Sequence, residues 1–584
     1  MKTQKYLTVE EAVEQVLGDS EATEADIVIL PPSDNLEDSD IEDINDEDLT
    51  PEVPADVCGE VEVAVESRDE EVDEDDKLLS TYCQESGDTK GKRNPEKPKP
   101  RWIKTDDFTT TMEEHPPTKL ADIRPDLLQK TPFELFIEIM GEDYLEELAY
   151  MTNIYARQKL ASIDTNADEI TRFFGILLHS GYHHVPKEKH YWSTAEDLSN
   201  QIVPKTMSRK PFEDLKIYFH IVDNLQLPPG KAAKIEPFYT HLSAQFLKIG
   251  GVFSESLSID ESMVPYYGHH SCKMFLRGKP IRFGYKIWMM CSPDGFPFSM
   301  QIYTGAKYQP EESGTDKTEK VLLGTRVISD LISVIQEPRN HCLFFDNFFT
   351  SHNLMVELKE KGFRAIGTVR ENRTGKCPLM APKELRKKDR GEFDYRGDGD
   401  IICVRWNDSS VVTVMSNWMK PFPLQNASRY SLKEKKKVLI KQPKIIGAYN
   451  QGMGGVDLLD RLLSAYRPTL RSKKWWWNLF SNGLNMAVVA AWKIHCHLLG
   501  KEAMSHLDFL REVSTVAMKC GLSSYRIRKG GPTASISADV KASQPHFLST
   551  TSQGRCAVCS KNTKKWCEFC GKRLHEKCFP DYHA

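Results

Sequence analysis

The stretch SLSIDESM (residues 256–263) marks a change in the character of this 584-residue chain. Upstream of it, from about residue 105 to residue 255, apolar residues recur at three- and four-residue spacing, which predicts helices. SLSID itself is short and rich in residues that favour strands, and the segments after it are also predicted as strands. A helical region therefore ends where a sheet begins.

The segments that follow predict a mixed α/β core. YKIWMMC (285–291) and FSMQIYTG (298–305) flank the turn sequence SPDGFP and predict a hairpin. A helix, the strand CLFF (342–345), a second helix and the strand FRAIGTVR (363–370) come next. The predicted order is therefore β-β-β-α-β-α-β. Residues 371–443 are rich in charge and short strands, and we interpret them as an inserted subdomain.

Four aspartates occupy distinctive positions in this order. Asp260 lies within or at the end of the first strand, and Asp346 follows CLFF. Asp457 opens the helix after the insertion, and Asp460 shares its helix face. Phosphoryl transfer on DNA uses two divalent cations about 4 Å apart, and Mg²⁺ prefers carboxylate oxygens. Carboxylates from strand ends and an adjoining helix would suit such a pair, whereas the alternative is that they cap turns and helices.

The motifs around these aspartates resemble those of the piggyBac family of transposases and of domesticated proteins derived from them. The matching stretches follow family order over roughly residues 115–584: SIDESMVPYYG, RGKPIRFGYKIW, FFDNFFTS, GTVR, YNQGMGGVDLLD, KKWWW and the terminal Cys/His cluster. The resemblance implies an RNase H-like catalytic core with an insertion before its last helix. It also implies that Asp260, Asp346 and Asp457 bind Mg²⁺ as the catalytic triad, with Asp460 as a supporting carboxylate.

The same resemblance implies an activity and partners. The family cuts and joins DNA through hairpin intermediates at TTAA sites, so double-stranded DNA, a homodimer and a nuclear location are expected. The alternative is a domesticated DNA- or chromatin-binding protein that keeps the fold without mobilisation, so the sequence does not decide whether the chain is an active enzyme.

The resemblance and the local patterns together predict an α/β multidomain chain. Its predicted parts are a disordered acidic region (1–104), a helical dimerisation and DNA-binding domain (105–255 and 467–545), a catalytic core (256–370 and 444–466), the β-rich insertion (371–443) and a zinc-binding domain (553–584).

Clustered cations predict where DNA would bind. Five lie within fourteen residues after the first strand and would neutralise backbone phosphates: Lys273, Arg277, Lys279, Arg282 and Lys286. Arg370 and Arg373 follow a core strand and resemble family positions near DNA. The motif RSKKWWW adds Arg471, Lys473, Lys474 and Trp475, and Trp475 matches a family tryptophan that supports distorted bases by stacking. The alternative for each cation is an ordinary solvated surface.

The last 29 residues contain five of the 14 cysteines and predict a zinc module. In the preferred cross-brace arrangement, Cys556, Cys559, His575 and Cys578 bind one ion, while Cys567, Cys570 and His583 bind a second with Asp581 or water. So short a segment would depend on zinc for its folding free energy. The family's similar domain recognises element ends, and nearby lysines favour DNA over the alternative partners, a histone tail or a ubiquitin-conjugating enzyme.

Charge is divided unevenly along the chain. Residues 1–90 carry 30 acidic and 5 basic side chains, whereas the remainder carries 54 acidic and 72 basic ones. The acidic leader cannot bury enough apolar surface to offset chain entropy, which predicts disorder. The basic body favours a polyanionic partner such as nucleic acid. No apolar run approaches the roughly 20 residues that span a bilayer, so no membrane partner is expected.

Overall fold

The computed structural model describes residues 4–6, 22–30, 60–67, 100–104, 117–268, 270, 272–275, 281, 283–305, 322–431, 434–522, 547–567 and 572–583. The chain divides into two units, residues 1–522 and 523–584. Among the helices of these described ranges, none has both the length and the apolar character needed to cross a membrane.

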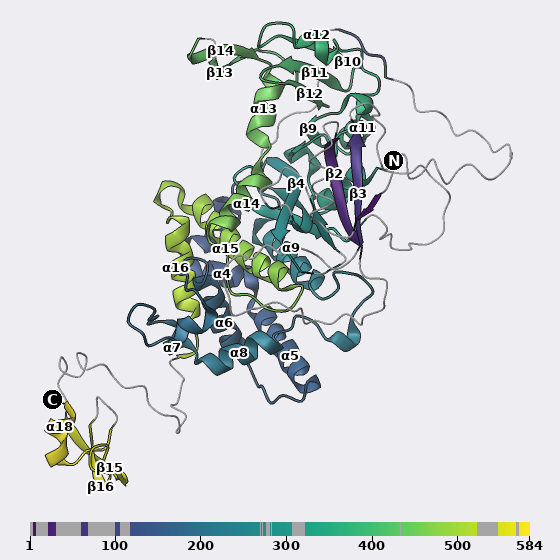
Figure 1. Cartoon of the computed structure of the whole chain (residues 1–584). Helices are drawn as coiled ribbons and strands as arrows, with labels where there is room; N and C mark the ends of the chain where they lie inside the picture. Colours follow the sequence, from purple (N-terminus) through teal and green to yellow (C-terminus); the bar gives the residue numbers. More distant parts are fainter. Residues whose placement is uncertain are drawn as a thin grey trace. The chain divides into compact units, whose positions relative to one another are not determined.

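A nine-stranded sheet forms the centre of the described part of the first unit (Figure 1). Its strand order is β10-β11-β12-β9-β8-β4-β6-β5, and β7 also pairs with β6. The bounds are β4 (Ser256–Pro265), β5 (Lys273–Phe275), β6 (Phe283–Cys291), β7 (Pro297–Ile302), β8 (Cys342–Phe345), β9 (Arg364–Thr368), β10 (Phe393–Gly397), β11 (Ile402–Asn407) and β12 (Val411–Ser416).

Two kinds of pairing organise this sheet. The strands β4, β8 and β9 run parallel, with Ile259 opposite Phe345 and Phe345 opposite Gly367. The remaining neighbours are antiparallel, and β6 with β7 confirms the hairpin predicted around SPDGFP. The helices α10 (Leu323–Ile332) and α11 (His352–Glu360) make the connections between β7, β8 and β9, which parallel strands require.

Most strands of the predicted insertion join the central sheet. Its strands β10, β11 and β12 extend the central sheet, because β12 pairs with β9 through Val414 and Thr368. Only β13 (Gln425–Ser431) and β14 (Lys436–Gln442) form a hairpin of their own within this segment. The chain then continues through α13 (Lys444–Gly452) into α14 (Gly455–Ala465).

Helices from both sides of the sheet-forming segment pack together. Helix α15 contacts α4 and α9, while α16 contacts α6 and α4. This packing joins the two parts of the predicted helical domain, whose roles in dimerisation and DNA binding stay predictions. The helices are α3 (Leu120–Ile123), α4 (Pro132–Met140), α5 (Glu142–Gln158), α6 (Ala167–His179), α7 (Val203–Thr206), α8 (Arg209–Tyr218), α9 (Glu236–Gly250), α15 (Trp477–Leu499) and α16 (His506–Ala517), with α12 (Pro382–Leu385) in the insertion.

The predicted disordered leader contains three strands. These are β1 (Gln4–Tyr6), β2 (Ala22–Leu30) and β3 (Glu60–Ser67), in the order β1-β3-β2. The sequence EVEVAVES of β3 alternates polar and apolar residues, a pattern typical of a strand. Further on, Ile103 pairs with Gly397 of β10, and Trp102 Nε1 donates to Gly375 O at 3.0 Å. The rest of residues 1–99 lies outside the described residues.

Candidate active site and metal centre

Asp260 and Asp346 follow paired residues on two adjacent parallel strands. Ile259 of β4 lies opposite Phe345 of β8, so Asp260 within β4 and Asp346 directly after β8 occupy neighbouring positions. Asp260 is 8% exposed and Asp346 is half-buried. The Glu261 backbone N–H donates to Asp260 Oδ1 at 2.8 Å, and that of Phe348 donates to Asp346 Oδ1 at 2.9 Å. Backbone geometry therefore helps to orient both carboxylates.

Helix α14 is held against β4 by a pair of serines. The Gly455 N–H donates to Ser258 Oγ at 3.2 Å, and Ser262 Oγ donates to Asp460 Oδ1 at 2.5 Å. Every second side chain of a strand points to the same face, so residues 258, 260 and 262 share one face of β4. Asp260 therefore lies on the face that meets α14. Asp457 is exposed in the first turn of that helix. The aspartates predicted from sequence thus come from β4, the end of β8 and α14.

A glycine permits this close packing. A Cβ atom at Gly455 would lie 2.2 Å from Ser292 O, closer than such atoms approach, and 3.1 Å from Ser258 Cβ, a tight contact. The preceding residue, Gly454, has a φ of +96°, a backbone conformation that residues other than glycine rarely adopt. The GG pair of the motif GMGGVD therefore turns the chain and allows α14 to begin directly against β4.

Tyr449 of α13 lies in the electrostatic field of all three predicted metal ligands. Burial raises the pKa of Tyr449 to about 12; a hydrogen bond with Thr368 opposes that rise, and Asp346, Asp260 and Asp457 add to it. Thr368 ends β9, the third parallel strand. Sequence reasoning missed both residues, although Tyr449 belongs to the same YNQGMGGVDLLD motif as Asp457.

Asp260, Asp346 and Asp457 offer oxygen donors, which is the ligand type that Mg²⁺ prefers. Within the described ranges, the one group of three or more metal-ligand side chains whose donor atoms all lie within 4.8 Å of one another is in the C-terminal unit. The Mg²⁺ site at these aspartates therefore stays a prediction.

Three of the cations predicted to contact DNA are buried and make contacts within the chain, and their role in DNA binding stays a prediction. The Lys273 ammonium donates to Tyr267 O at 3.2 Å and Gly268 O at 3.1 Å. The Lys474 ammonium donates to the carbonyls of Lys216 and Phe219 at 3.0 and 2.6 Å. Lys286 lies 3.9 Å from the centre of the Trp288 ring. Each is under 10% exposed.

Two predicted arginines lie close to Asp346. Arg370 Nε donates to Asn347 Oδ1 at 3.4 Å, and an Arg373 guanidinium nitrogen donates to Phe348 O at 2.5 Å. Both arginines are half-buried. They are therefore positioned beside the turn that carries Asp346. Arg471 is half-buried and Lys473 is exposed, whereas Arg277, Lys279 and Arg282 lie outside the described residues.

Trp475 is covered by another aromatic ring. Its ring stacks on His270, with ring centres 3.7 Å apart and planes 11° apart, and the residue is 5% exposed. In this structure His270 occupies one face of the Trp475 ring, and the stacking of a base on Trp475 stays a prediction. Trp476 and Trp477 are both 1% exposed and contribute to the core, as predicted.

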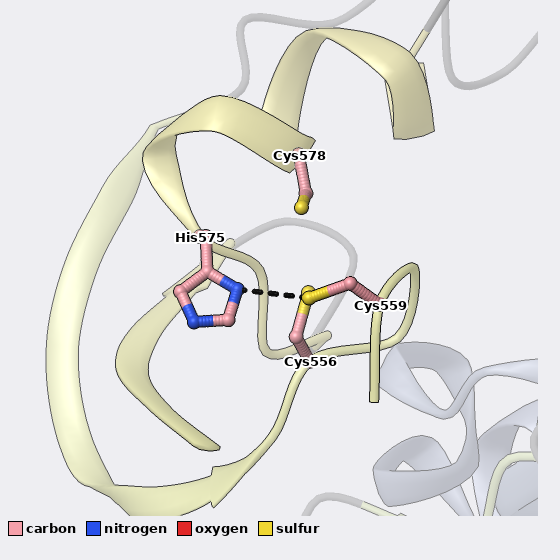
Figure 2. Close-up of side chains that lie close together, drawn as sticks. All are labelled: Cys556, Cys559, His575 and Cys578. Carbon is pink, nitrogen blue, oxygen red and sulfur yellow. Dashed lines mark hydrogen bonds between the residues drawn. The ribbon is translucent and has the colours of Figure 1, made fainter. Parts of the chain in front are cut away.

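The C-terminal unit brings four predicted zinc ligands together. Cys556, Cys559, His575 and Cys578 place their donor atoms within 4.8 Å of one another (Figure 2). Cys559 Sγ lies 3.3 Å from His575 Nδ1. Burial raises the pKa of Cys556, but hydrogen bonds from backbone N–H groups, including that of Cys559, bring it down to about 6. Three thiols and one imidazole in this spacing fit a tetrahedral zinc site.

The elements that carry these ligands are short. They are β15 (Leu548–Arg555), β16 (Asn562–Cys567), the 3-10 turn Glu576–Cys578 and α18 (Phe579–His583). The first predicted ligand set is thus confirmed as a group that could hold a metal ion. For the second set, Cys567 is buried, while Cys570 and the His583 side chain lie outside the described residues. That second site, with Asp581 or water as its eighth ligand, stays a prediction.

Comparison with known proteins is consistent with this geometry. The family described as Transposase IS4 matches residues 131–492. Human PiggyBac transposable element-derived protein 3 is 36% identical over 465 residues, covering 78% of this chain and 77% of that protein. Human PiggyBac transposable element-derived protein 2 is 30% identical over 495 residues, covering 83% and 82%.

A solved structure has a similar fold. The cryo-EM structure of a piggyBac transposase synaptic complex with hairpin DNA has a TM-score of 0.55 and 20% sequence identity, covering 80% of this chain and 100% of that chain. At this identity the likeness concerns the fold. The family match and the extent of the two human relatives together establish that the chain belongs to the piggyBac family of transposases and transposable element-derived proteins.

Proposed function

We propose that this chain is a metal-dependent DNA transposase of the piggyBac type, or a derivative that retains its strand-cleaving chemistry. The proposal is that it cuts and joins double-stranded DNA through hairpin intermediates at TTAA sites, as a homodimer in the nucleus. The observation that supports it is the register of Ile259 with Phe345, which makes Asp260 within β4 and Asp346 after β8 neighbours, with α14 packed against β4.

Each carboxylate has a role in this proposal. Asp260, Asp346 and Asp457 would hold two Mg²⁺ ions, which when bound supply an activated attacking oxygen and a stabilised leaving oxygen. Asp460 would orient the site through its hydrogen bond from Ser262. Arg370 and Arg373, beside the turn of Asp346, would bind phosphate oxygens of the strand being cut. Tyr449 and Thr368 would complete the wall of the site.

The test is strand cleavage by the purified full chain. The substrate is a duplex with an end adjoining TTAA, labelled on each strand, with and without Mg²⁺. We expect nicked and hairpin products that require Mg²⁺. Asp346→Ala should reduce the yield of these products by more than the roughly 10–100-fold loss that is typical when a residue supporting a metal ligand is changed. Unchanged cleavage by Asp346→Ala would exclude the proposed triad.

A second candidate function is DNA or chromatin binding without mobilisation. It is favoured by the names of the two human relatives, which describe them as derived from transposable elements. This candidate predicts tight duplex binding with no Mg²⁺-dependent product. The zinc-binding tail contributes to DNA binding under either candidate, and removal of residues 547–584 should weaken binding to element ends while cleavage chemistry is retained on a saturating substrate.

A further inference from the structure

The hairpin β13–β14 has one packed face and one open face. On the packed face Ala427 lies opposite Ile440, and both are under 10% exposed. Trp406 of β11 supports this face, since its Nε1 donates to Lys441 O at 2.9 Å. The side chains that alternate with these point to the other face. The hairpin is therefore a two-stranded ribbon with one surface left for another molecule.

Ion pairs hold the ribbon in place on the sheet. Arg429 Nε donates to Asp408 Oδ2 at 2.9 Å, and Arg390 binds the other oxygen of the same carboxylate. Arg390 also donates to Tyr430 O at 3.3 Å. Asp408 lies between β11 and β12, so these contacts fix the hairpin to the extended sheet. A ribbon that is ordered before binding loses little conformational entropy when a partner arrives.

The open face combines apolar side chains with lysines. Leu439 is 70% exposed and Tyr430 is 57% exposed. Lys437 lies directly opposite Tyr430, and Lys441 lies two residues beyond Leu439 on the same strand. Both lysines are exposed. Lysine side chains therefore flank an apolar centre on one flat surface.

The net charge of this ribbon selects its partner. Four of its described lysines are exposed: Lys435, Lys436, Lys437 and Lys441. In the described residues of the hairpin the one carboxylate is Glu434, which pairs with Lys436 at 3.1 Å. An acidic partner is therefore favoured.

We propose that the open face of β13–β14 binds double-stranded DNA in its major groove, at a contact separate from the aspartate site. The major groove is about 12 Å wide and admits a two-stranded ribbon. At about 3.3 Å per residue, Lys437 and Lys441 are separated by about 13 Å, with Leu439 midway. The two lysines can thus reach the phosphates on either side, while Leu439 and Tyr430 contact base edges. DNA as the partner rests on the proposed function.

The first test removes charge. Full-chain Lys437→Ala/Lys441→Ala is compared with the unaltered protein in duplex-binding titrations across a salt series without Mg²⁺. Loss of two phosphate contacts should lower the slope of log affinity against log salt by about 2, and should weaken binding about tenfold at low salt. The matched control Lys501→Ala/Lys519→Ala removes two exposed lysines elsewhere and should leave the slope nearly unchanged. Equal effects in both variants, or none in either, would overturn the proposal.

The second test removes apolar contact and keeps the charge. Tyr430→Ser/Leu439→Ser should weaken duplex binding about fivefold with an unchanged salt slope, because no phosphate contact is lost. Heparin, a polyanion without a groove, should bind this variant as well as the unaltered protein. Equal losses for heparin and duplex would show a general polyanion surface and overturn groove binding.

The failure of the ribbon proposal can be distinguished from the failure of the proposed function. If the unaltered protein binds duplex but never cleaves it, the enzymatic proposal fails and the ribbon contact is still measured. If it cleaves while both ribbon variants bind normally, the ribbon proposal alone fails. Melting temperatures of all variants should match, since the altered side chains are exposed.

Discussion

Ile259 and Phe345 lie opposite each other on parallel strands, and each is followed by an aspartate. This register matters because a shift by one residue would turn Asp260 to the opposite face of the sheet. Helix α14 depends on the same strand, since Gly455 donates to Ser258. The position of Asp457 is thereby linked to that of Asp260.

Tyr449→Phe should reduce cleavage about tenfold without weakening DNA binding. The change removes only the hydroxyl that is hydrogen-bonded to Thr368 beside the three carboxylates. Thr368→Val should have a similar effect, and the double variant should lose little more, because both changes break one contact. Single-turnover cleavage rates measure this coupling. Tyr150→Phe, at a position 59% exposed, is the control, and full additivity of the two site changes would contradict the linkage.

Gly455→Ala should displace α14 and lower cleavage. The new Cβ would clash with the carbonyl of Ser292, so the helix must shift away from β4, at a cost of about 1–3 kcal/mol for overpacking. Cleavage rate and thermal unfolding report the two effects. Ser464→Ala, at an exposed position of the same helix, should change neither. Full activity in Gly455→Ala would mean that the helix start is not constrained as described.

The first unit should lose stability as the pH falls from about 6.5 towards 4. Burial, together with the nearby His183, lowers the pKa of His179 to about 4 in the folded chain, against 6.5 for an ordinary histidine. Below pH 6.5 the unfolded chain therefore binds a proton that the folded chain does not. At pH 5 this costs about 2 kcal/mol per histidine, and His506, with a pKa also near 4 through burial, adds to it.

Urea unfolding at several pH values measures this loss. His179→Gln should reduce the dependence between pH 6.5 and pH 4 and leave the contribution of His506, whereas His184→Gln at an exposed position should leave the dependence unchanged. A dependence in His179→Gln as steep as that of the unaltered chain would show that His179 is not responsible.

The C-terminal unit should unfold when its metal is removed. Its described apolar core is small, centred on Cys556, Cys567 and Leu574, so metal binding would supply most of its folding free energy. Cys559→Ser should lower the zinc content by one ion per chain and make residues 547–583 sensitive to protease. Val558→Ala, an exposed neighbour, should retain zinc. Equal zinc content in both variants would exclude Cys559 as a ligand.

Part of this architecture could be predicted from sequence. The hairpin around SPDGFP, the strand before Asp346 and the grouping of Cys556 with His575 follow from local patterns and spacing. The contacts of Lys474 and Trp475 could not be predicted from local sequence, because the burial of a cation or a ring depends on which distant segments pack around it. Tyr449 was missed for the same reason, since its partner Thr368 is brought to it by the sheet.

The bond between Gly455 and Ser258 joins residues 197 positions apart. A ribosome therefore completes β4 and the whole insertion before α14 exists, and the last ligands of the site are synthesised late. A nascent or prematurely terminated chain that ends before residue 457 carries Asp260 and Asp346 without the helix that completes their cluster. If the proposed function holds, the order of synthesis would keep unfinished copies from cutting DNA.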